Sequence, residues 1–454
     1  MDAREKLGTH QKALSINLDA NVFGSFAEIG AGQEVARWFL RVGGASGTVA
    51  KTISAYDKEV SDDLYGGGTR YVSKPRLQAM LDNEWAQLLV QLQPSRGATA
   101  NFFSFVDTIS ARNFSGSNDC HGWVGLRFLQ HPGGPANEVI LHVNLRDSTN
   151  VRQQEAVGIL GVNLLYAVQH TIASPGEFLA SVFEDLGLHR VEIDNVELSG
   201  PAFESWNRDE VHILLVTGGF AQAVVFGADG QLAPPNEALY KRALVLAPGR
   251  FDNFAHLRAE LIRGTLGELP AEELQESKGG LGLFCLSADP GTSKVSSVPP
   301  AEIADVVKRL QELGYGVMVF GCPELYEMSA FVNRYTKARI HFAIGLSVLV
   351  RVMEDRYKKL SGTLLEGIAR LFAQNVRLVV YPMASAELQR FVEQAGLTGW
   401  TWEETDGMVY ADKLHPAKPL DYLFKYLLSE YWVLPSQKAI SLSPETGKSG
   451  SAAG

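Results

Sequence analysis

Residues 138–168, EVILHVNLRDSTNVRQQEAVGILGVNLLYAV, join the pattern of a strand to that of a buried helix. Apolar residues alternate through the first eight positions, which predicts a strand with one apolar face. The next polar stretch, residues 147–150, contains only good helix N-caps, and beyond the first turn the apolar residues surround the expected helix on nearly all sides. We therefore expect a long helix buried beside a sheet.

Two glycines, Gly158 and Gly161, lie in the middle of this expected helix. A glycine inside a helix costs roughly 1 kcal/mol relative to alanine. Such glycines are usually tolerated where another backbone packs closely against the helix. The preceding sheet is the nearest candidate for that contact.

The rest of the N-terminal part supplies further elements of both kinds. Helical spacing predicts helices over residues 33–42 and 76–92. Strand-like runs are found at NFFSFVDTI, HGWVGLRFL, HRVEIDNVELSG, VHILLVTGG and FAQAVVFGADG. The turn HPGGPANE predicts that residues 121–129 and 138–145 form a hairpin. Residues 1–270 are therefore expected to form a mixed, partly antiparallel α+β domain.

The C-terminal part has a different rhythm, in which short β-branched strands alternate with amphipathic helices. This alternation predicts a three-layer parallel α/β domain, Rossmann-like, over residues 281–435, after a polar linker at 269–280. Ligands of such sheets bind beyond the carboxyl ends of the strands. Those ends carry Ser287, Ala288, Asp289, Gly321, Cys322, Gly345, Pro382 and Met383. Residues 436–454 are small and polar, so we expect a disordered tail.

Composition limits the class of protein. The chain has 454 residues, a formal net charge of -10 and 46% hydrophobic residues, as expected for a soluble protein of two or three domains. The acidic balance argues against nucleic acid as a partner but allows a local basic pocket. No apolar run is long enough to span a membrane, and the N-terminus lacks a secretory pattern. Three widely spaced cysteines, Cys120, Cys285 and Cys322, favour a reducing cytoplasm.

A glycine-rich stretch, GGASGTVAKT at residues 43–52, invites comparison with a phosphate-binding P-loop. The motif G-x-x-x-x-G-K-[ST] requires glycine at two positions that are occupied here by Ala45 and Ala50. A weaker interpretation remains, in which backbone amides around Gly44 and Gly47 approach an anion and Lys51 supplies a charge. The alternative is a flexible corner between two helices.

A second glycine cluster, EIGAGQEV at residues 28–35, precedes the first expected helix. Gly30 and Gly32 have the spacing of a dinucleotide fingerprint, but Val35 occupies the third glycine position. The preceding NVFGSFAEI is also a poor strand by composition. What remains is a helix N-terminus lined with small residues, which is a candidate anion site.

The most polar constellation is VDTISARNFSGSNDCHGW, residues 106–123. Asp119 and His121 are candidates for acid–base work or for binding a metal, and Arg112 and Asn113 for binding a ligand. Beyond the next strand, Arg146 and Glu155 could face the same pocket. The alternatives are a hydrogen-bonded turn for the loop and an ordinary helix-dipole complement for the first-turn carboxylate.

Two further candidates are weaker. Asp57, Asp62 and Asp63 suggest Mg²⁺ as a cofactor only by their spacing. Cys322 lies at a strand-to-helix junction, where a helix N-terminus could lower its pKa, although a buried and inert thiol is the commoner case.

Four stretches carry a resemblance to a known family: FAEIGAGQEVARWFLRVGGASGTVAKTISAYDKEVSD, HGWVGLRF, EVILHVNLRD and QQEAVGILGVNLLYA. Together they resemble a family of uncharacterised bacterial proteins of similar length, along most of the chain. Its members carry the labels nicotinate-nucleotide adenylyltransferase and TonB-dependent receptor. The present residues support neither label, because the adenylyltransferase motif G-G-x-F-D-P-x-H-x-G-H and an export signal are both missing. The resemblance therefore implies no site residues.

Two functions follow as hypotheses. The first is a cytoplasmic enzyme acting on a nucleotide or another phosphorylated small molecule, with Lys51, Arg112 and Arg146 binding anionic groups. Asp119, His121 or Glu155 would handle protons or a metal. The second is a non-catalytic binding or assembly protein that uses the polar loops as a protein interface, with a homo-oligomer as one candidate assembly. The first hypothesis requires these residues to converge on one pocket.

Overall fold

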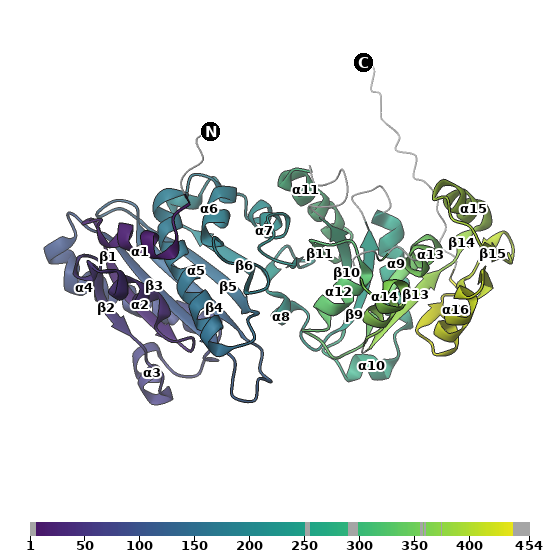
Figure 1. Ribbon diagram of the computed structural model, residues 1–454, viewed down its shortest axis with the longest axis horizontal. Coiled ribbons are helices and arrows are strands. Elements are labelled where there is room, and N and C mark those ends of the chain that lie inside the picture. The colour runs from purple at the N-terminus through teal and green to yellow at the C-terminus, as the bar shows by residue number, and fades with distance from the viewer. Residues whose placement is uncertain are drawn as a thin grey trace, which may run out of the picture. The chain divides into compact units, whose positions relative to one another are not determined.

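The computed structural model describes residues 6–249, 255–288, 298–354, 357, 360–373 and 375–438. The chain divides into two compact units, Met1–Val224 with Ala288–Asp305, and Val225–Ser287 with Val306–Gly454 (Figure 1). Each unit has its own large sheet, which confirms the expected combination of α/β and α+β structure. Within the described ranges, no helix has the length and apolar character needed to cross a membrane.

The first unit is built on a six-stranded sheet with the order β2-β1-β3-β4-β5-β6. Its strands are β1 (Val22–Ile29), β2 (Val49–Ile53), β3 (Asn101–Ser110), β4 (His121–Leu129), β5 (Ala136–Leu145) and β6 (Val191–Ser199). β1 runs parallel to both β2 and β3. From β3 to β6, each strand is antiparallel to its neighbour. The sheet is therefore partly antiparallel, as expected, and the predicted β4–β5 hairpin is confirmed.

Helices cover both faces of this sheet. On one face, α4 (Lys74–Arg96) packs Leu77, Met80 and Leu81 in one cluster with Val106 and Trp123, and α3 (Lys58–Tyr65) adds Tyr65. On the other face, next to Phe105, lie α2 (Glu34–Val42) and α5 (Asn150–His170). α1 (Thr9–Asn17) packs against both of these helices. Adjacent residues of a strand point to opposite faces, so Val106 and Phe105 belong to different layers.

The long helix predicted after β5 is α5, and Thr149 caps it by accepting a hydrogen bond from the amide of Arg152. Its two glycines do mark a close contact, but mainly with α2. A Cβ at Gly158 would lie 3.1 Å from Trp38, and one at Gly161 would lie 2.3 Å from Val35. Only Gly161 also meets the sheet, where the same Cβ would lie 3.0 Å from Phe105. The small residues thus let two helices approach on one face of the sheet.

The second unit contains an eight-stranded sheet with the order β18-β13-β12-β9-β10-β11-β7-β8. These strands are β7 (Ala223–Phe226), β8 (Leu232–Ala233), β9 (Ala243–Gly249), β10 (Gly280–Ser287), β11 (Gly316–Phe320), β12 (Ile340–Gly345), β13 (Val376–Tyr381) and β18 (Val433–Pro435). From β11 to β18 the neighbouring strands are parallel, in the 3-2-1-4-5-6 order of doubly wound sheets.

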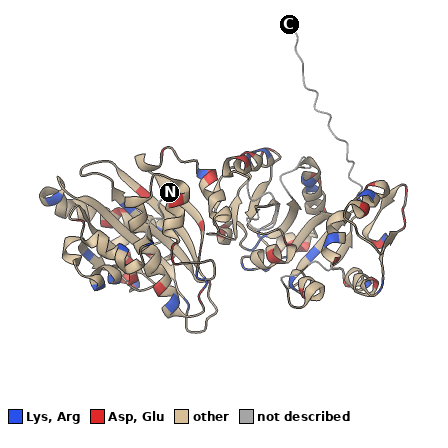
Figure 2. Ribbon diagram, turned by 45° about the horizontal axis from the view of Figure 1, so that its top comes forward, with Lys and Arg blue, Asp and Glu red and all other residues tan. Residues whose placement is uncertain are grey.

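Helices alternate with these strands as the sequence predicts. They include α9 (Ala255–Glu268), α11 (Pro300–Gln311), α12 (Leu325–Val332), α13 (Leu346–Met353), α14 (Thr363–Leu371), α15 (Ser385–Gln394) and α16 (Leu420–Ser429). The antiparallel pairs β14 (Met383–Ala384) with β16 (Met408–Val409), and β15 (Trp400–Trp402) with β17 (Leu414–Pro416), lie outside the main sheet. Lys and Arg residues are interspersed with Asp and Glu residues on the helices and loops of both units (Figure 2).

Several expectations about boundaries and elements are wrong. The parallel sheet includes β7 and β9, which precede residue 281, and the expected linker at 269–280 contains α10 (Ala271–Gln275). Residues 211–217 belong to α7 (Arg208–Thr217), which Asn207 caps, because a short apolar run fits a buried helix as well as a strand. Residues 22–29, judged a poor strand, form β1. Asp289 and most of the expected tail, residues 439–454, lie outside the described residues.

The α2–α5 contact can be tested with Gly161→Ala. We expect a loss of about 1–3 kcal/mol in the free energy of unfolding, because the added methyl group overlaps Val35 in a packed interface. Gly176→Ala in α6 (Pro175–Val182) is the control, since nothing lies within 4 Å of that Cβ. Denaturant unfolding of both variants and of Gly161→Ala with Val35→Ala measures the coupling. Purely additive effects in the double variant would contradict the assignment.

Candidate functional site

The glycine corner after α2 is closed by the chain itself. Asn17 donates from Nδ2 to the carbonyl oxygens of Phe39 at 2.8 Å and Gly43 at 2.7 Å. Gly44 has a φ of 75°, and a Cβ there would lie 3.4 Å from the Asn17 side chain. The corner continues through Gly47 into strand β2, so it joins a helix to a strand and not to a second helix. Gly44 and Gly47 therefore have a structural reason to be small.

Lys51 does not face the glycine clusters. Its Nζ lies 2.5 Å from Oε2 of Glu84 and 3.1 Å from Oε1 of Gln87, both on α4. The neighbouring Thr52 points to the other face, where its hydroxyl accepts a hydrogen bond from Gln33 beside α2. Lys51 and the N-terminus of α2 thus lie on opposite faces of the sheet. The expected anion site that combines Lys51 with the glycines is wrong.

The amides at the N-terminus of α2 already bind a carboxyl group from within the protein. Glu28 of β1 accepts hydrogen bonds from the amides of Val35 at 3.0 Å and Ala36 at 2.9 Å. A Cβ at Gly30 would lie 1.8 Å from the carbonyl oxygen of Ile109, so glycine is required for the chain to pass β3. Gly30 and Gly32, both with positive φ, lead the chain from β1 to a helix whose amides turn back to Glu28. An external anion would have to compete with this carboxylate.

Asp107 lies directly opposite Glu28 in the β1–β3 pairing, and both side chains are buried. Its Oδ1 accepts from the amide of Ile29 at 3.0 Å, while Oδ2 has no hydrogen-bond partner in the part of the chain that the structure describes. Burial raises the pKa of Glu28 to about 7. Burial and the charge of Glu28 also raise the pKa of Asp107 well above its usual value. Two facing carboxyl groups that cannot both ionise therefore keep a proton at neutral pH.

The polar loop between β3 and β4 is largely a hydrogen-bonded turn. Asn113 Oδ1 accepts from the hydroxyl of Ser115 and the amide of Ser117, each at 3.1 Å. The amide of Arg112 donates to Gln153 of α5 at 2.8 Å, and its guanidinium packs over Gly116. The side chains of Arg112 and Asp119 are exposed. Within the described part of the chain, Arg112 forms no ion pair, so it is the loop residue that remains suited to binding a ligand.

His121 is the first residue of a buried hydrogen-bonded chain. Its Nδ1 lies 3.1 Å from Nε2 of His142, and Nδ1 of His142 lies 2.5 Å from Oδ1 of Asp194. Asn144 donates to the other oxygen of Asp194 at 2.7 Å. His121 and Asn144 face each other across β4 and β5, and an irregularity in the β5–β6 register beside His142 brings Asp194 to the same place. These side chains share the sheet face that α4 covers.

The polarity of this chain follows from its carboxylate end. With Asp194 as an acceptor, His142 donates from Nδ1 and accepts at Nε2, so His121 donates from Nδ1 and carries its lone pair on Nε2. Burial, with smaller contributions from His142 and Arg70, lowers the pKa of His121 to about 4. The imidazole is therefore neutral near pH 7. Asp119 of the loop raises the pKa of His121, but this effect is smaller than that of burial, His142 or Arg70.

Arg146 and Glu155 belong to separate ion pairs. Arg146 binds the buried carboxylate of Glu192 through Nε, at 3.2 Å, and Nη2. Glu155 accepts from Arg190 at 2.9 Å on an exposed surface. Each pair has a structural role, in neutralising a buried charge or in fixing the start of α5. The expectation that Arg146 and Glu155 line one pocket with the polar loop is not supported by these contacts.

The predicted site residues do not converge as a whole. Lys51 on β2 and Arg146 after β5 are separated by four strand spacings, about 19 Å in the sheet. Arg112 lies two residues beyond Ser110, the register partner of His121, so these two remain neighbours. Sequence reasoning missed Arg70, His142 and Asp194. The alternation in EVILHVNL does place His142 on one face with Ile140 and Asn144, but nothing marked Asp194 before the register was known.

The metal and thiol candidates find no support. Asp57 caps α3, and Asp62 pairs with Arg76 at 3.0 Å. Across the described ranges, no three His, Cys, Asp or Glu side chains are grouped to hold a metal ion. Burial, reinforced by Glu327, raises the pKa of the Cys322 thiol, which is the opposite of activation. The ends of β10 to β13 do carry Ser287, Gly321, Gly345 and Pro382, as expected for a doubly wound sheet.

The shared proton of Glu28 and Asp107 predicts a pH-dependent stability. The folded pKa of Glu28, about 7, exceeds its ordinary value of 4.5. Between these values the unfolded chain releases a proton that the folded chain keeps, so stability falls as the pH rises. Glu28→Gln should make the slope of unfolding free energy against pH shallower from pH 4.5 to 7. It should also cost about 1–3 kcal/mol at low pH, because one helix amide loses its acceptor.

Glu59→Gln, an exposed change in α3, is the matched control and should leave this slope unaltered. Chemical denaturation at several pH values measures both variants. A slope in Glu28→Gln equal to that of the wild type would show that the buried pair does not titrate in this range.

No protein-family model and no curated protein matches this chain. Among solved structures, a competence/damage-inducible protein, CihA, from Agrobacterium tumefaciens is similar over 37% of this chain and 100% of its own, with 20% identity and a TM-score of 0.28. A CinA superfamily protein from Enterobacter cloacae is similar over 37% of this chain and 96% of its own, with 14% identity and a TM-score of 0.27. These values are low, so no property of either protein is carried to this chain.

Proposed function

We propose that the chain is a cytoplasmic enzyme acting on a nucleotide or another phosphorylated small molecule, with its acid–base centre at His121. The observation that carries the proposal is the buried chain from Asp194 through His142 to His121, which ends beside the loop of Arg112. Free thiols at Cys120, Cys285 and Cys322 fit a reducing compartment.

The hydrogen-bonded chain suits His121 to act as a general base. A substrate hydroxyl or a water molecule would transfer its proton to Nε2 of His121. The resulting positive charge is stabilised through His142 by the buried carboxylate of Asp194, which also fixes the tautomer. Asn144 holds the second oxygen of that carboxylate. Such an arrangement contributes through orientation and charge stabilisation, as in other nucleophile–histidine–carboxylate systems.

Two arginines near His121 suit a phosphate group. Arg70 is close enough to lower the pKa of His121, and Arg112 follows the strand that pairs with His121. Both are exposed, and neither forms an ion pair with any described residue. A bound phosphate would offset the effect of Arg70 and so raise the pKa of His121 above its value in the free protein. Substrate binding would thereby strengthen the base at the pH where it must work.

A thermal-shift screen of the full chain against nucleotides and phosphorylated metabolites tests the binding step. A ligand at 100 times its dissociation constant stabilises the folded state by about 2.7 kcal/mol. We expect at least one of these ligands to lose its shift in Arg70→Gln with Arg112→Gln and to keep it in Arg37→Gln, an exposed arginine on α2. Failure of every phosphorylated compound to shift the transition would overturn the proposed substrate class.

The catalytic step has its own test. For any compound that binds, product formation by mass spectrometry should fall about 10²–10⁴-fold in His121→Gln, the range for loss of a general acid–base group. Asp194→Asn should lower turnover but not binding, and should alter the NMR-detected tautomer of His142. Full turnover in His121→Gln would exclude His121 as the base.

The second candidate function, a non-catalytic assembly protein, is favoured by Phe114. This residue lies in the β3–β4 loop and is fully exposed, and aromatic residues are enriched in protein interfaces. If the loop is a protein interface, analytical ultracentrifugation should detect a homo-oligomer that Phe114→Ser dissociates. A monomer at all concentrations, together with phosphate-dependent turnover, would favour the enzyme.

A further inference from the structure

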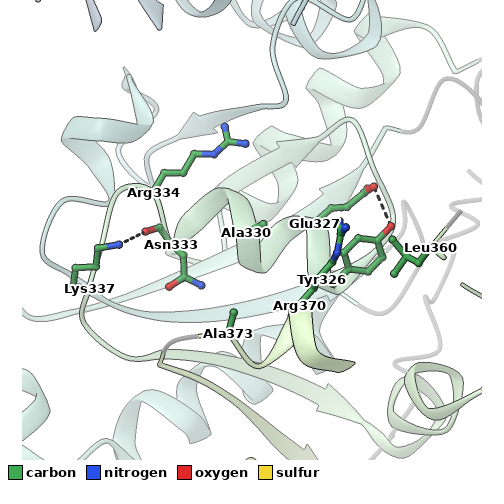
Figure 3. Close-up of a pocket in the computed structure, with 9 residues that line it drawn as sticks. All are labelled: Tyr326, Glu327, Ala330, Asn333, Arg334, Lys337, Leu360, Arg370 and Ala373. Atoms are coloured by element: carbon green, nitrogen blue, oxygen red, sulfur yellow. Dashed lines mark hydrogen bonds between the residues drawn. The ribbon is translucent and has the colours of Figure 1, made fainter. Parts of the chain in front are cut away.

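The second unit carries a groove with a strongly basic lining, far in sequence from the acid–base centre (Figure 3). Its volume is about 760 Å³, which lies within the range of small-molecule sites. One wall is α12 with the turn and loop that follow it. The other wall is the end of α14 with Ala373 beyond it. Neither the strand ends of the sheet nor Cys322 contributes to the lining.

The lining follows one face of α12. Tyr326, Ala330 and Asn333 are spaced by four and three residues, so they lie on one side of α12 and its C-cap, and Lys337 follows in the loop after the turn. Leu360 and Ala373 add apolar surface. The Tyr326 ring is fixed by an edge contact with Tyr357, with ring centroids 5.8 Å apart, and its hydroxyl donates to Glu327 at 3.3 Å.

The charges of the groove differ in sign from the charge of the whole chain. Three cations, Arg334, Lys337 and Arg370, line it with one carboxylate, Glu327, although the chain has a formal net charge of -10. Figure 3 shows Arg334 and Lys337, which follow α12, on one side of the groove. Arg370 lies on the other side, beside Tyr326 and Glu327. Arg370 pairs with Glu366 one turn earlier, at 2.6 Å on an exposed surface, and such a pair yields readily to a stronger anion.

Asn333 supplies an observation independent of these charges. Its side chain is only 6% exposed, and Nδ2 donates to the carbonyl and hydroxyl oxygens of Ser329 at 2.9 and 3.3 Å. This donation fixes the amide orientation, and Oδ1 has no hydrogen-bond partner among the described residues. A buried acceptor without a donor is uncommon in folded proteins. At the wall of a ligand-sized groove, it is suited to an N–H group of a ligand.

We propose that this groove binds a nucleoside monophosphate. The phosphate would lie at Arg334 and Lys337, the base would extend along the groove toward Arg370 and the exposed edges of Tyr326 and Leu360, and an N–H of the base would donate to Oδ1 of Asn333. An extended nucleic acid does not fit, because the cations are confined to this groove on a chain with a formal net charge of -10. This site lies in the second unit and is independent of the proposed substrate site at His121.

Isothermal titration of the full chain with the common nucleoside 5′-monophosphates tests the proposal. We expect at least one to bind, and the matching nucleoside and inorganic phosphate each to bind at least tenfold more weakly. A monophosphate whose base lacks the amino group, purine riboside 5′-monophosphate against the adenine compound, should also lose affinity. Equal affinity for inorganic phosphate, or no binding across the panel, would overturn the proposal.

Variants assign the site. Arg334→Gln with Lys337→Gln should weaken binding at least tenfold, whereas the matched exposed pair Arg390→Gln with Lys425→Gln should not. Arg70→Gln with Arg112→Gln should leave this binding intact, which separates it from the His121 site. If the groove variant unfolds, amide exchange of the wild type with bound ligand decides the question. Protection is expected at residues 325–337 and 363–373, and protection elsewhere alone would overturn the assignment.

Discussion

The first unit depends on the hydrogen bonds that Glu28 accepts from the start of α2. These bonds tie the middle of the sheet to the first turn of the helix that covers it, and they set the direction in which α2 leaves β1. With α2 in this position, Val35 meets Gly161 and α5 can lie beside it. The same carboxylate satisfies amides that would otherwise attract an external anion. The imidazole chain from His121 to Asp194 lies on the opposite face of the sheet.

That opposite face owes its polar chain to strand alternation. His121, Trp123, His142 and Asn144 point to one side because β4 and β5 pair without interruption. The register irregularity between β5 and β6 then supplies Asp194. The two faces thus differ in kind: on the face of α2 and α5 a pair of carboxyl groups lies among small and apolar residues, and the other face contains a chain of imidazoles that ends on a carboxylate. In the groove of the second unit, by contrast, the charged side chains come from α12, the turn and loop that follow it, and α14.

Local patterns were sufficient for most elements but not for the site. Alternation predicted β4 and β5, and capping with apolar periodicity predicted α5 and the helices of the second unit. β1 was missed because Gly24 and Ser25 have low strand propensity, and its pairing with β2 and β3 overrides that propensity. Lys51 was assigned to the wrong neighbourhood because residues 43–52 were interpreted as a corner, whereas strand β2 directs this side chain to Glu84 of α4. Asp194 could not be predicted, since its position depends on pairing between distant strands.

The position of β1 between β2 and β3 also bears on how the chain folds during synthesis. Val22 pairs with Asn101, so the edge of β1 that pairs with β3 stays uncovered until residues much later in the chain have been synthesised. Until then, the carboxyl group of Glu28 has no buried partner and can stay hydrated and ionised. Long-range parallel pairing of this kind slows folding and leaves an open strand edge. The nascent first unit is thus exposed to aggregation until β3 has emerged from the ribosome.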